Sequence, residues 1–200
     1  MSDGIRNVED PRVLGQRMVE LVNGYQVSAA IGAVARLGVA DFLSAGPAHL
    51  GDVAARVGAD PRSLERVLRL LANVGIFEEL DDARFALTAF GEMLRSDVPG
   101  SVHRGAIVAS EEWHWRAYGH FIHSVRTGEP GFRQAHGCGF WEYLERHPQA
   151  GTLVNDSMSR AASFIAAAFV WAYDLSGIGS TRRAAVVSAL GCARRPRPRE

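Results

Sequence analysis

The sequence predicts a mainly α-helical protein, built on a winged helix-turn-helix with a helical extension. Three observations carry this prediction. Apolar residues recur at spacings of three and four over most of the chain. Residues 50–88 have the order helix, turn, helix, hairpin. Strands and helices do not alternate anywhere, so these residues predict no parallel nucleotide-binding sheet.

The first elements follow from their start and stop residues. Residues 1–10 are polar and are expected to form a flexible lead. Asp10 and Pro11 then supply an N-cap and a first helical residue. A second helix is expected from about Tyr25 to Leu37, with Gly38 after it. This second helix is apolar on nearly all sides, which indicates a buried position or an interface between subunits.

Residues 50–88 have the strongest pattern. A short helix is expected over residues 50–57, and Asp60 and Pro61 begin the next one. The apolar stripe of this helix consists of Leu64, Val67, Leu68, Leu71 and Val74. Two short strands, 76–80 and 84–88, flank Asp81-Asp82-Ala83 and predict a hairpin.

The rest of the chain is expected to be helical up to a basic tail. The pattern places helices at about 99–109, 112–126, 139–146, 148–160 and 161–173. We therefore divide the chain into four parts: a lead (1–10), a winged-helix domain (11–98), a helical lid and linker region (99–179), and an Arg/Pro-rich tail (180–200) expected to be disordered.

The charges are distributed unevenly, although they sum to zero. The chain has no lysine, so arginine supplies all 22 basic residues. Residues 1–180 hold 16 arginines and 21 acids, a net charge of −5, and residues 181–200 carry +5. Two cysteines, a polar N-terminus and no apolar run of bilayer length indicate a reduced, cytoplasmic protein without a signal peptide or membrane span.

Two kinds of site are weighed against plainer interpretations. Arg62, Arg66 and Arg69 on the second helix of the helix-turn-helix would suit DNA. The acidic body and the two aspartates of the hairpin oppose that interpretation, because they repel phosphate. His120 and His123 are three residues apart on one helix, but no zinc-protease motif surrounds them. We therefore expect no metal site and consider nucleic acid an improbable partner.

Aromatic residues gather in the helical extension. Trp113, Trp115, Tyr118, Phe121, Phe140, Trp141 and Tyr143 either line a flat apolar ligand pocket or pack between helices. No nucleophile–base pair and no pair of carboxylates reaches the level of a catalytic hypothesis, so no catalytic residue is predicted.

Several segments together resemble the N-terminal region of bacterial S-adenosylmethionine-dependent O-methyltransferases of the plant caffeate and hydroxyneurosporene type. The resemblance runs from about Val13 to Gly179. In the first half of the chain the resemblance is carried by GYQVSAA at 24–30, by ARLGVAD at 35–41, and by residues 64–77, which have a pattern of the form LxRLLRxLxxxGxF. In the second half it is carried by SVRTGEP at 124–130, HG at 136–137 and FWEYL at 140–144. Asn155, Met158 and YDLSG at 173–177 complete it.

The resemblance implies a dimerisation domain followed by a helical substrate lid. It implies a homodimer formed through residues 11–43 and the helical extension. The family transfers a methyl group from S-adenosylmethionine to a hydroxyl of a small, usually aromatic acceptor. The acceptor pocket would be lined by Trp115, His136, Phe140, Trp141, Asn155 and Met158. The chain departs from the family at Val154, where a phenylalanine is usual.

A larger departure follows the linker at 173–177. The family continues there into a strand ending in Asp-x-Gly-Gly-Gly, which opens the Rossmann-like cofactor domain. Residues 178–200 hold no such motif. We therefore expect a methyltransferase truncated or frameshifted before that domain, which binds no S-adenosylmethionine and is inactive alone. A genuine short paralogue, a winged-helix DNA-binding regulator and a dimerisation partner of an intact paralogue remain as alternatives.

Overall fold

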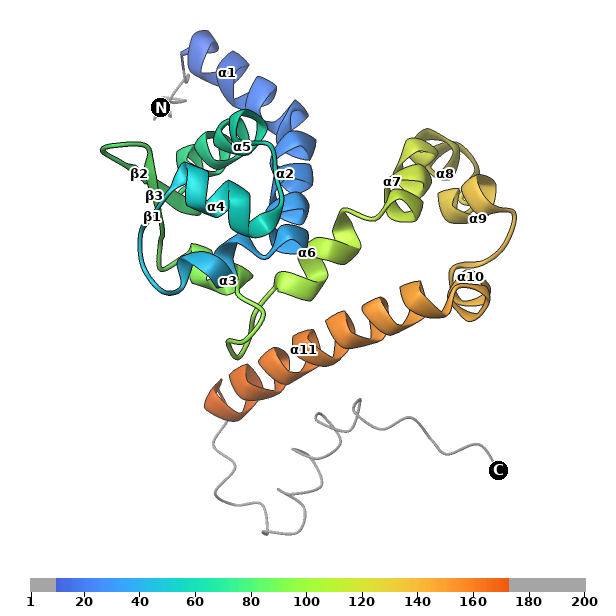
Figure 1. The fold of residues 1–200 in the computed structure, drawn as a ribbon. Helices are drawn as coiled ribbons and strands as arrows, with labels where there is room; N and C mark the ends of the chain where they lie inside the picture. Colours follow the sequence, from blue (N-terminus) through green and yellow to red (C-terminus); the bar gives the residue numbers. More distant parts are fainter. Residues whose placement is uncertain (1–9, 173–200) are drawn as a thin grey trace, which may run out of the picture.

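The computed structural model describes residues 10–172, with side chains described as far as Ala162. The predicted lead, the linker after Ala172 and the Arg/Pro-rich tail lie outside these residues. Within them the chain forms a winged-helix body, a helical arm that extends from it, and one long helix that returns from the arm (Figure 1).

The winged-helix body contains the N-terminal helices and a small sheet. Its elements are α1 (Pro11–Val22), α2 (Gly24–Leu37), α3 (Val39–Leu43), β1 (Ala48–His49), α4 (Leu50–Val57), α5 (Pro61–Asn73), β2 (Phe77–Leu80), β3 (Arg84–Leu87) and the 3-10 helix η1 (Gly91–Leu94). Helices α1 and α2 follow each other almost end to end along one side (Figure 1). The mainly helical winged helix-turn-helix is thus confirmed.

The predicted helix starts are confirmed in atomic detail. Asp10 accepts a hydrogen bond from the Arg12 backbone N–H at 2.9 Å, and Asp60 accepts one from the Ser63 N–H at 2.8 Å. Each cap is followed by a proline at the first helical position, where no backbone hydrogen bond is lost. The Ser63 bonds also lower the pKa of Asp60.

The predicted hairpin pairs β2 with β3, and a third strand joins it. Strand β1 pairs antiparallel with β3, which gives the order β1-β3-β2. The two residues of β1 are too short to show alternation, so the sequence did not predict this strand. Asp82 and Ala83 at the hairpin tip have φ of 59° and 53°. Backbone of that kind is what a tight hairpin requires, although glycine or asparagine usually supplies it.

The core of the body lies between α2, α5 and the sheet. Leu64, Leu68 and Leu71 of the predicted α5 stripe are buried, together with Phe77 and Phe85 of the hairpin. Val74 was predicted on the same stripe but is 42% exposed, because α5 ends at Asn73 and Val74 has left the helical repeat.

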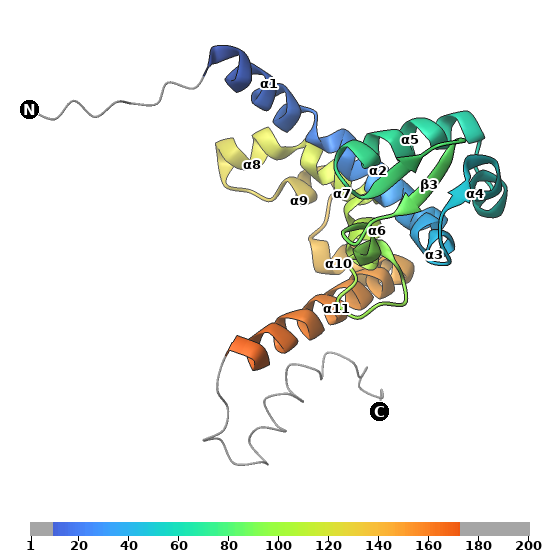
Figure 2. The ribbon, with the colours of Figure 1, turned by 90° about the vertical axis from the view of Figure 1, so that its left-hand side faces the viewer.

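The helical extension contains six helices. They are α6 (His103–Ala109), α7 (Glu112–Gly119), α8 (Phe121–Thr127), α9 (Gly131–His136), α10 (Phe140–Arg146) and α11 (Pro148–Ala172). Helix α6 connects the body to the helical arm, which we define as α7–α10. Helix α11 returns from the arm and packs against α6, as two perpendicular views show (Figures 1 and 2).

Four of the predicted helix boundaries differ in the structure. The helix expected over 99–109 begins only at His103, because Gly100 has a φ of 75°, which an α-helix does not contain. The expected helix 112–126 is interrupted at His120, where the chain turns between α7 and α8. Residues 131–136, which no predicted helix included, form the short helix α9. The expected helices 148–160 and 161–173 are one continuous helix as far as Ala172, since no glycine or proline interrupts the chain between them.

Candidate functional site

The six predicted pocket residues lie on the arm and on α11. Trp115 is in α7, His136 ends α9, Phe140 and Trp141 begin α10, and Asn155 and Met158 are in α11. Their surroundings divide them into two groups.

His136 and Phe140 belong to the packed interior of the arm. Trp113, Leu144 and Val154 form its buried centre, and Phe140 packs against them. The His136 Nε2 lies 2.9 Å from the Trp113 carbonyl oxygen. A carbonyl can only accept, so this nitrogen carries the hydrogen and donates it. Both side chains therefore hold α9 and α10 against α7.

The other four residues are partly or wholly exposed. Trp115 is half-buried, and its ring meets that of Tyr25 edge-on at a centroid distance of 6.5 Å, which ties the arm to α2. Trp141 is 62% exposed and Met158 is 53% exposed. Asn155 is also exposed. Of these four, Trp141 meets the ring of Phe140 at a centroid distance of 5.1 Å and so borders the aromatic interior. The role of all four in acceptor binding stays a prediction.

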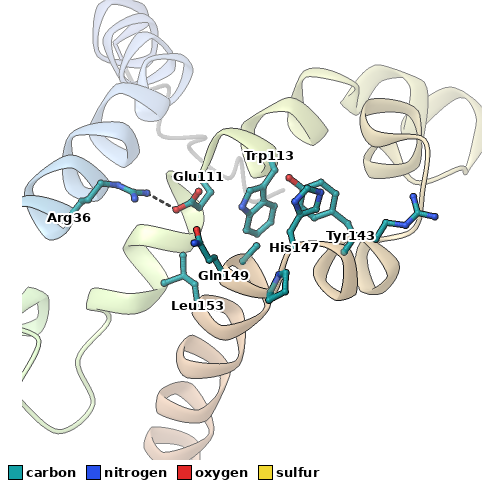
Figure 3. Close-up of a pocket in the computed structure, with 10 residues that line it drawn as sticks. Arg36, Glu111, Trp113, Tyr143, His147, Gln149 and Leu153 are labelled. Carbon is teal, nitrogen blue, oxygen red and sulfur yellow. Dashed lines mark hydrogen bonds and ion pairs between the residues drawn. The ribbon is translucent and has the colours of Figure 1, made fainter.

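A hollow of about 650 Å³ opens where α2, α7, α10 and α11 meet (Figure 3). Its volume falls within the range of small-molecule sites. None of the six predicted residues lines it. It is lined by Arg36, Glu111, Trp113, Tyr143, Arg146, His147, Pro148, Gln149, Ala150 and Leu153.

An ion pair lies at one end of this hollow. The Arg36 guanidinium donates from Nη2 to Oε1 of Glu111 at 2.7 Å, as the dashed line in Figure 3 marks. Arg36 is in the last turn of α2 and Glu111 immediately precedes α7, so this contact joins body and arm. The pair is partly exposed, and we assign it little stability of its own.

A second, smaller hollow of about 310 Å³ lies between η1, α6 and α11. Its wall is mostly apolar, with Met93, Val102 and Ala161 among its residues, and Arg160 and Ser157 add polar groups. Both hollows use residues of α11 spaced by three or four, namely Ala150, Leu153, Ser157, Arg160 and Ala161. Such residues share one side of a helix, so the two hollows follow the same flank of α11.

Alternative sites find less support. Among the described residues, no group of three histidine, cysteine or acidic side chains could hold a metal ion. In the helix-turn-helix, Arg69 donates to Glu79 at 2.8 Å and pairs with Glu65 at 3.1 Å. These two carboxylates raise the pKa of Arg69, and they take up hydrogen-bond donors of its guanidinium that a DNA phosphate would need. Over residues 10–172, no helix is long and apolar enough to cross a membrane.

Comparison with known proteins identifies the body. Residues 19–97 match the O-methyltransferase dimerisation domain. The chain is 34% identical to phenazine O-methyltransferase PhzM of Lysobacter antibioticus over 82% of its own length and 48% of the relative's. It is 37% identical to the mitomycin biosynthesis 6-O-methyltransferase of Streptomyces lavendulae, over 79% and 46% of the two chains. The chain belongs to the O-methyltransferase family.

Solved structures of the family agree with this fold. The structure of LaPhzM matches with a TM-score of 0.74 and 34% identity, over 80% of this chain and 48% of that one. The mitomycin 7-O-methyltransferase MmcR matches with a TM-score of 0.73 and 34% identity, over 92% and 57%. The chain spans about half the length of the curated relatives it matches, so the resemblance seen in the sequence is confirmed for that half.

Family members use S-adenosylmethionine, and the structure of NcsB1 from neocarzinostatin biosynthesis contains it together with a naphthoic acid. The residues described here do not fit this cofactor. Their sheet has strands of two, four and four residues, all antiparallel. It therefore lacks the parallel strand ends at which such sheets bind nucleosides.

Proposed function

We propose that this chain is the dimerising and acceptor-binding part of an S-adenosylmethionine-dependent O-methyltransferase. The acceptor is a small hydroxylated aromatic compound. The observation that carries the proposal is the aromatic-lined hollow of Figure 3, on the flank of α11. We infer that these 200 residues do not bind the cofactor or transfer a methyl group by themselves.

The shape and lining of the hollow support an aromatic acceptor. Trp113, Tyr143 and His147 are among the residues that line the hollow, and the ring centroids of Tyr143 and His147 lie 4.1 Å apart at an interplanar angle of 31°. Flat ring faces and the apolar Leu153 favour a planar ligand. The relatives bear names such as phenazine O-methyltransferase and 3-amino-4-hydroxybenzoate 4-O-methyltransferase, and both names denote aromatic substrates.

Exposed apolar helices support the homodimer. Helix α1 has no buried residue, and helix α8 in the arm has none either. We infer that residues 11–43 and the helical extension form the dimer interface, as the resemblance implies. A buried free thiol at Cys138 is consistent with the reducing, cytoplasmic setting that we propose.

Calorimetry on the purified chain tests the acceptor site. We expect 2-naphthol to bind at one site per chain with a dissociation constant of roughly micromolar to millimolar strength, as for a small apolar ligand. The substitution Leu153→Arg fills the hollow with a long charged side chain. We expect it to abolish the heat of 2-naphthol binding. Leu153 is only half-buried, so the fold should survive, as circular dichroism would check.

Two results would contradict the proposal. If 2-naphthol gives no binding heat with the unsubstituted chain, the acceptor site is wrong. If S-adenosylmethionine binds with micromolar affinity, the inference that these residues lack a cofactor site is wrong. The matched control is Val74→Arg, a similar change at a partly exposed position outside both the hollow and the proposed dimer interface, which should leave naphthol binding intact.

A further inference from the structure

We propose that the hollow of Figure 3 selects aromatic acceptors that carry a carboxylate, and that Arg36 binds this carboxylate. The inference rests on the proposed acceptor site and adds to it a substrate class and a specificity residue. Its basis is the geometry of Arg36 at the edge of an aromatic-lined wall.

The guanidinium of Arg36 is only partly used. Its single hydrogen bond in the described part of the chain runs from Nη2 to Glu111. Guanidinium offers five N–H donors in a planar fork, so several remain for another acceptor. The side chain is 54% exposed and lines the hollow, where a ligand can reach it. Arginine suits a carboxylate because its fork matches the two oxygens.

The other charged groups of the hollow identify Arg36 as the anchor. Arg146 also lines the hollow and has a comparable ion pair, with Glu142 one turn before it on α10. At 63% it is the more exposed of the two arginines, so water screens its charge more strongly. Glu111 is the acidic side chain of the lining, and it contacts Arg36 from the side of α7. An incoming carboxylate therefore competes with Glu111 for the same guanidinium. Because of this competition, substitutions of Arg36 and Glu111 should act in opposite directions.

The aromatic wall sets the orientation of such a ligand. Figure 3 shows Trp113, Tyr143 and His147 on one side of the hollow and Arg36 with Glu111 on the other. A flat ring system that lies against the aromatic side chains directs one substituent towards Arg36. A compound with a carboxylate there gains a charge-assisted hydrogen bond, which a plain naphthol lacks.

Calorimetry with two matched probes tests the inference. 2-Naphthol and 6-hydroxy-2-naphthoate share the hydroxylated ring and differ in the carboxylate. We expect the unsubstituted chain to bind the naphthoate at least about tenfold more tightly, as a hydrogen bond to a charged group predicts. R36Q should remove this preference and keep naphthol binding. E111Q should strengthen naphthoate binding, because the competing carboxylate has gone.

The outcomes separate the two proposals. Equal affinity for both probes, or a preference that survives in R36Q, overturns the carboxylate site and leaves the acceptor site standing. Failure of both probes to bind overturns the acceptor site as well. R56Q is the control, since Arg56 lies on α4 outside the lining of the hollow. If R56Q also lost the preference for the naphthoate, the preference would come from the net charge of the protein and not from Arg36, and the inference would be overturned.

Discussion

His103 is a buried histidine with one unsatisfied nitrogen. It begins α6, and its Nε2 lies 3.3 Å from the carbonyl oxygen of Ala35 in α2. The carbonyl accepts, so Nε2 carries the hydrogen of the neutral ring. Nδ1 is then left buried without a hydrogen-bond partner in the described residues. A proton on Nδ1 would place a positive charge in the interior with no hydrogen-bond acceptor for the new N–H. The ring therefore stabilises the α2–α6 contact only while it is neutral.

The protein should therefore lose stability as the pH falls below about 6.5. Burial lowers the pKa of His103 from its ordinary 6.5, Arg104 and Arg160 lower it further, and Asp41 opposes them. The unfolded chain takes up the proton first, so the contribution is complete above 6.5 and decreases as the pH falls from 6.5 towards the lowered pKa. One pH unit below 6.5, the loss is at most about 1.4 kcal/mol.

Urea unfolding at pH 7.5 and 5.5 measures this loss. His103→Gln keeps a donor for Ala35 but cannot titrate, so its stability should change less between the two pH values than that of the parent. The half-exposed His120 provides the control, because His120→Gln should retain the full pH dependence. An identical pH dependence in parent and His103→Gln would show that His103 does not carry it.

At the scale of elements, α2 and α6 approach so closely that only glycine fits at their crossing. A Cβ on Gly32 would overlap the side chain of Ser110 and lie 3.1 Å from the Ala106 carbonyl oxygen. Both neighbours are held, since the Ser110 hydroxyl donates to Ile107 at 2.9 Å. Gly32→Ala should therefore push α6 away from α2.

We expect Gly32→Ala to cost about 1–3 kcal/mol of unfolding free energy, as overpacking does. Gly15→Ala is the matched control in α1, where a Cβ meets nothing within 4 Å. It should stabilise by up to about 1 kcal/mol, because alanine favours helix more than glycine does. Ser110→Gly combined with Gly32→Ala should recover much of the loss. Two alanine variants of equal stability would show that the crossing is not tight.

Helices and strands could be predicted where residues close together in the sequence decide them, whereas most of the residues that line the hollows could not. Asp60 and Pro61 mark the start of α5 within the sequence itself, and the α5 stripe needs only helical spacing. Strand β1 exists through its pairing with β3, more than thirty positions away. Arg36 and Glu111 lie 75 positions apart, so no spacing rule brings them together. Of the residues that line the larger hollow, the sequence singled out Trp113 and Tyr143, as members of the aromatic cluster.

For the whole molecule, exposed apolar side chains are concentrated on a few helices. On α1, Leu21 is 71% exposed and Val22 is 66% exposed, and on α8 Val125 is 67% exposed. Helices α1 and α8 both project from the same side of the molecule in Figure 2. Patches of this kind mark interaction surfaces in soluble proteins. Residues 19–97 match a dimerisation domain, and we propose that a second copy covers these side chains.

Leu21→Glu should therefore weaken the dimer without unfolding the chain. The introduced carboxylate would be buried against apolar groups of the second copy, and we expect the dissociation constant to rise by about tenfold or more. Gln16→Glu adds the same charge to the same exposed helix but on its polar side, where Gln16 donates to Glu20, and it should have little effect. Sedimentation velocity over a range of concentrations distinguishes them. A parent chain that sediments as a monomer at high concentration, or equal dissociation constants for the two variants, would mean that α1 does not form the interface.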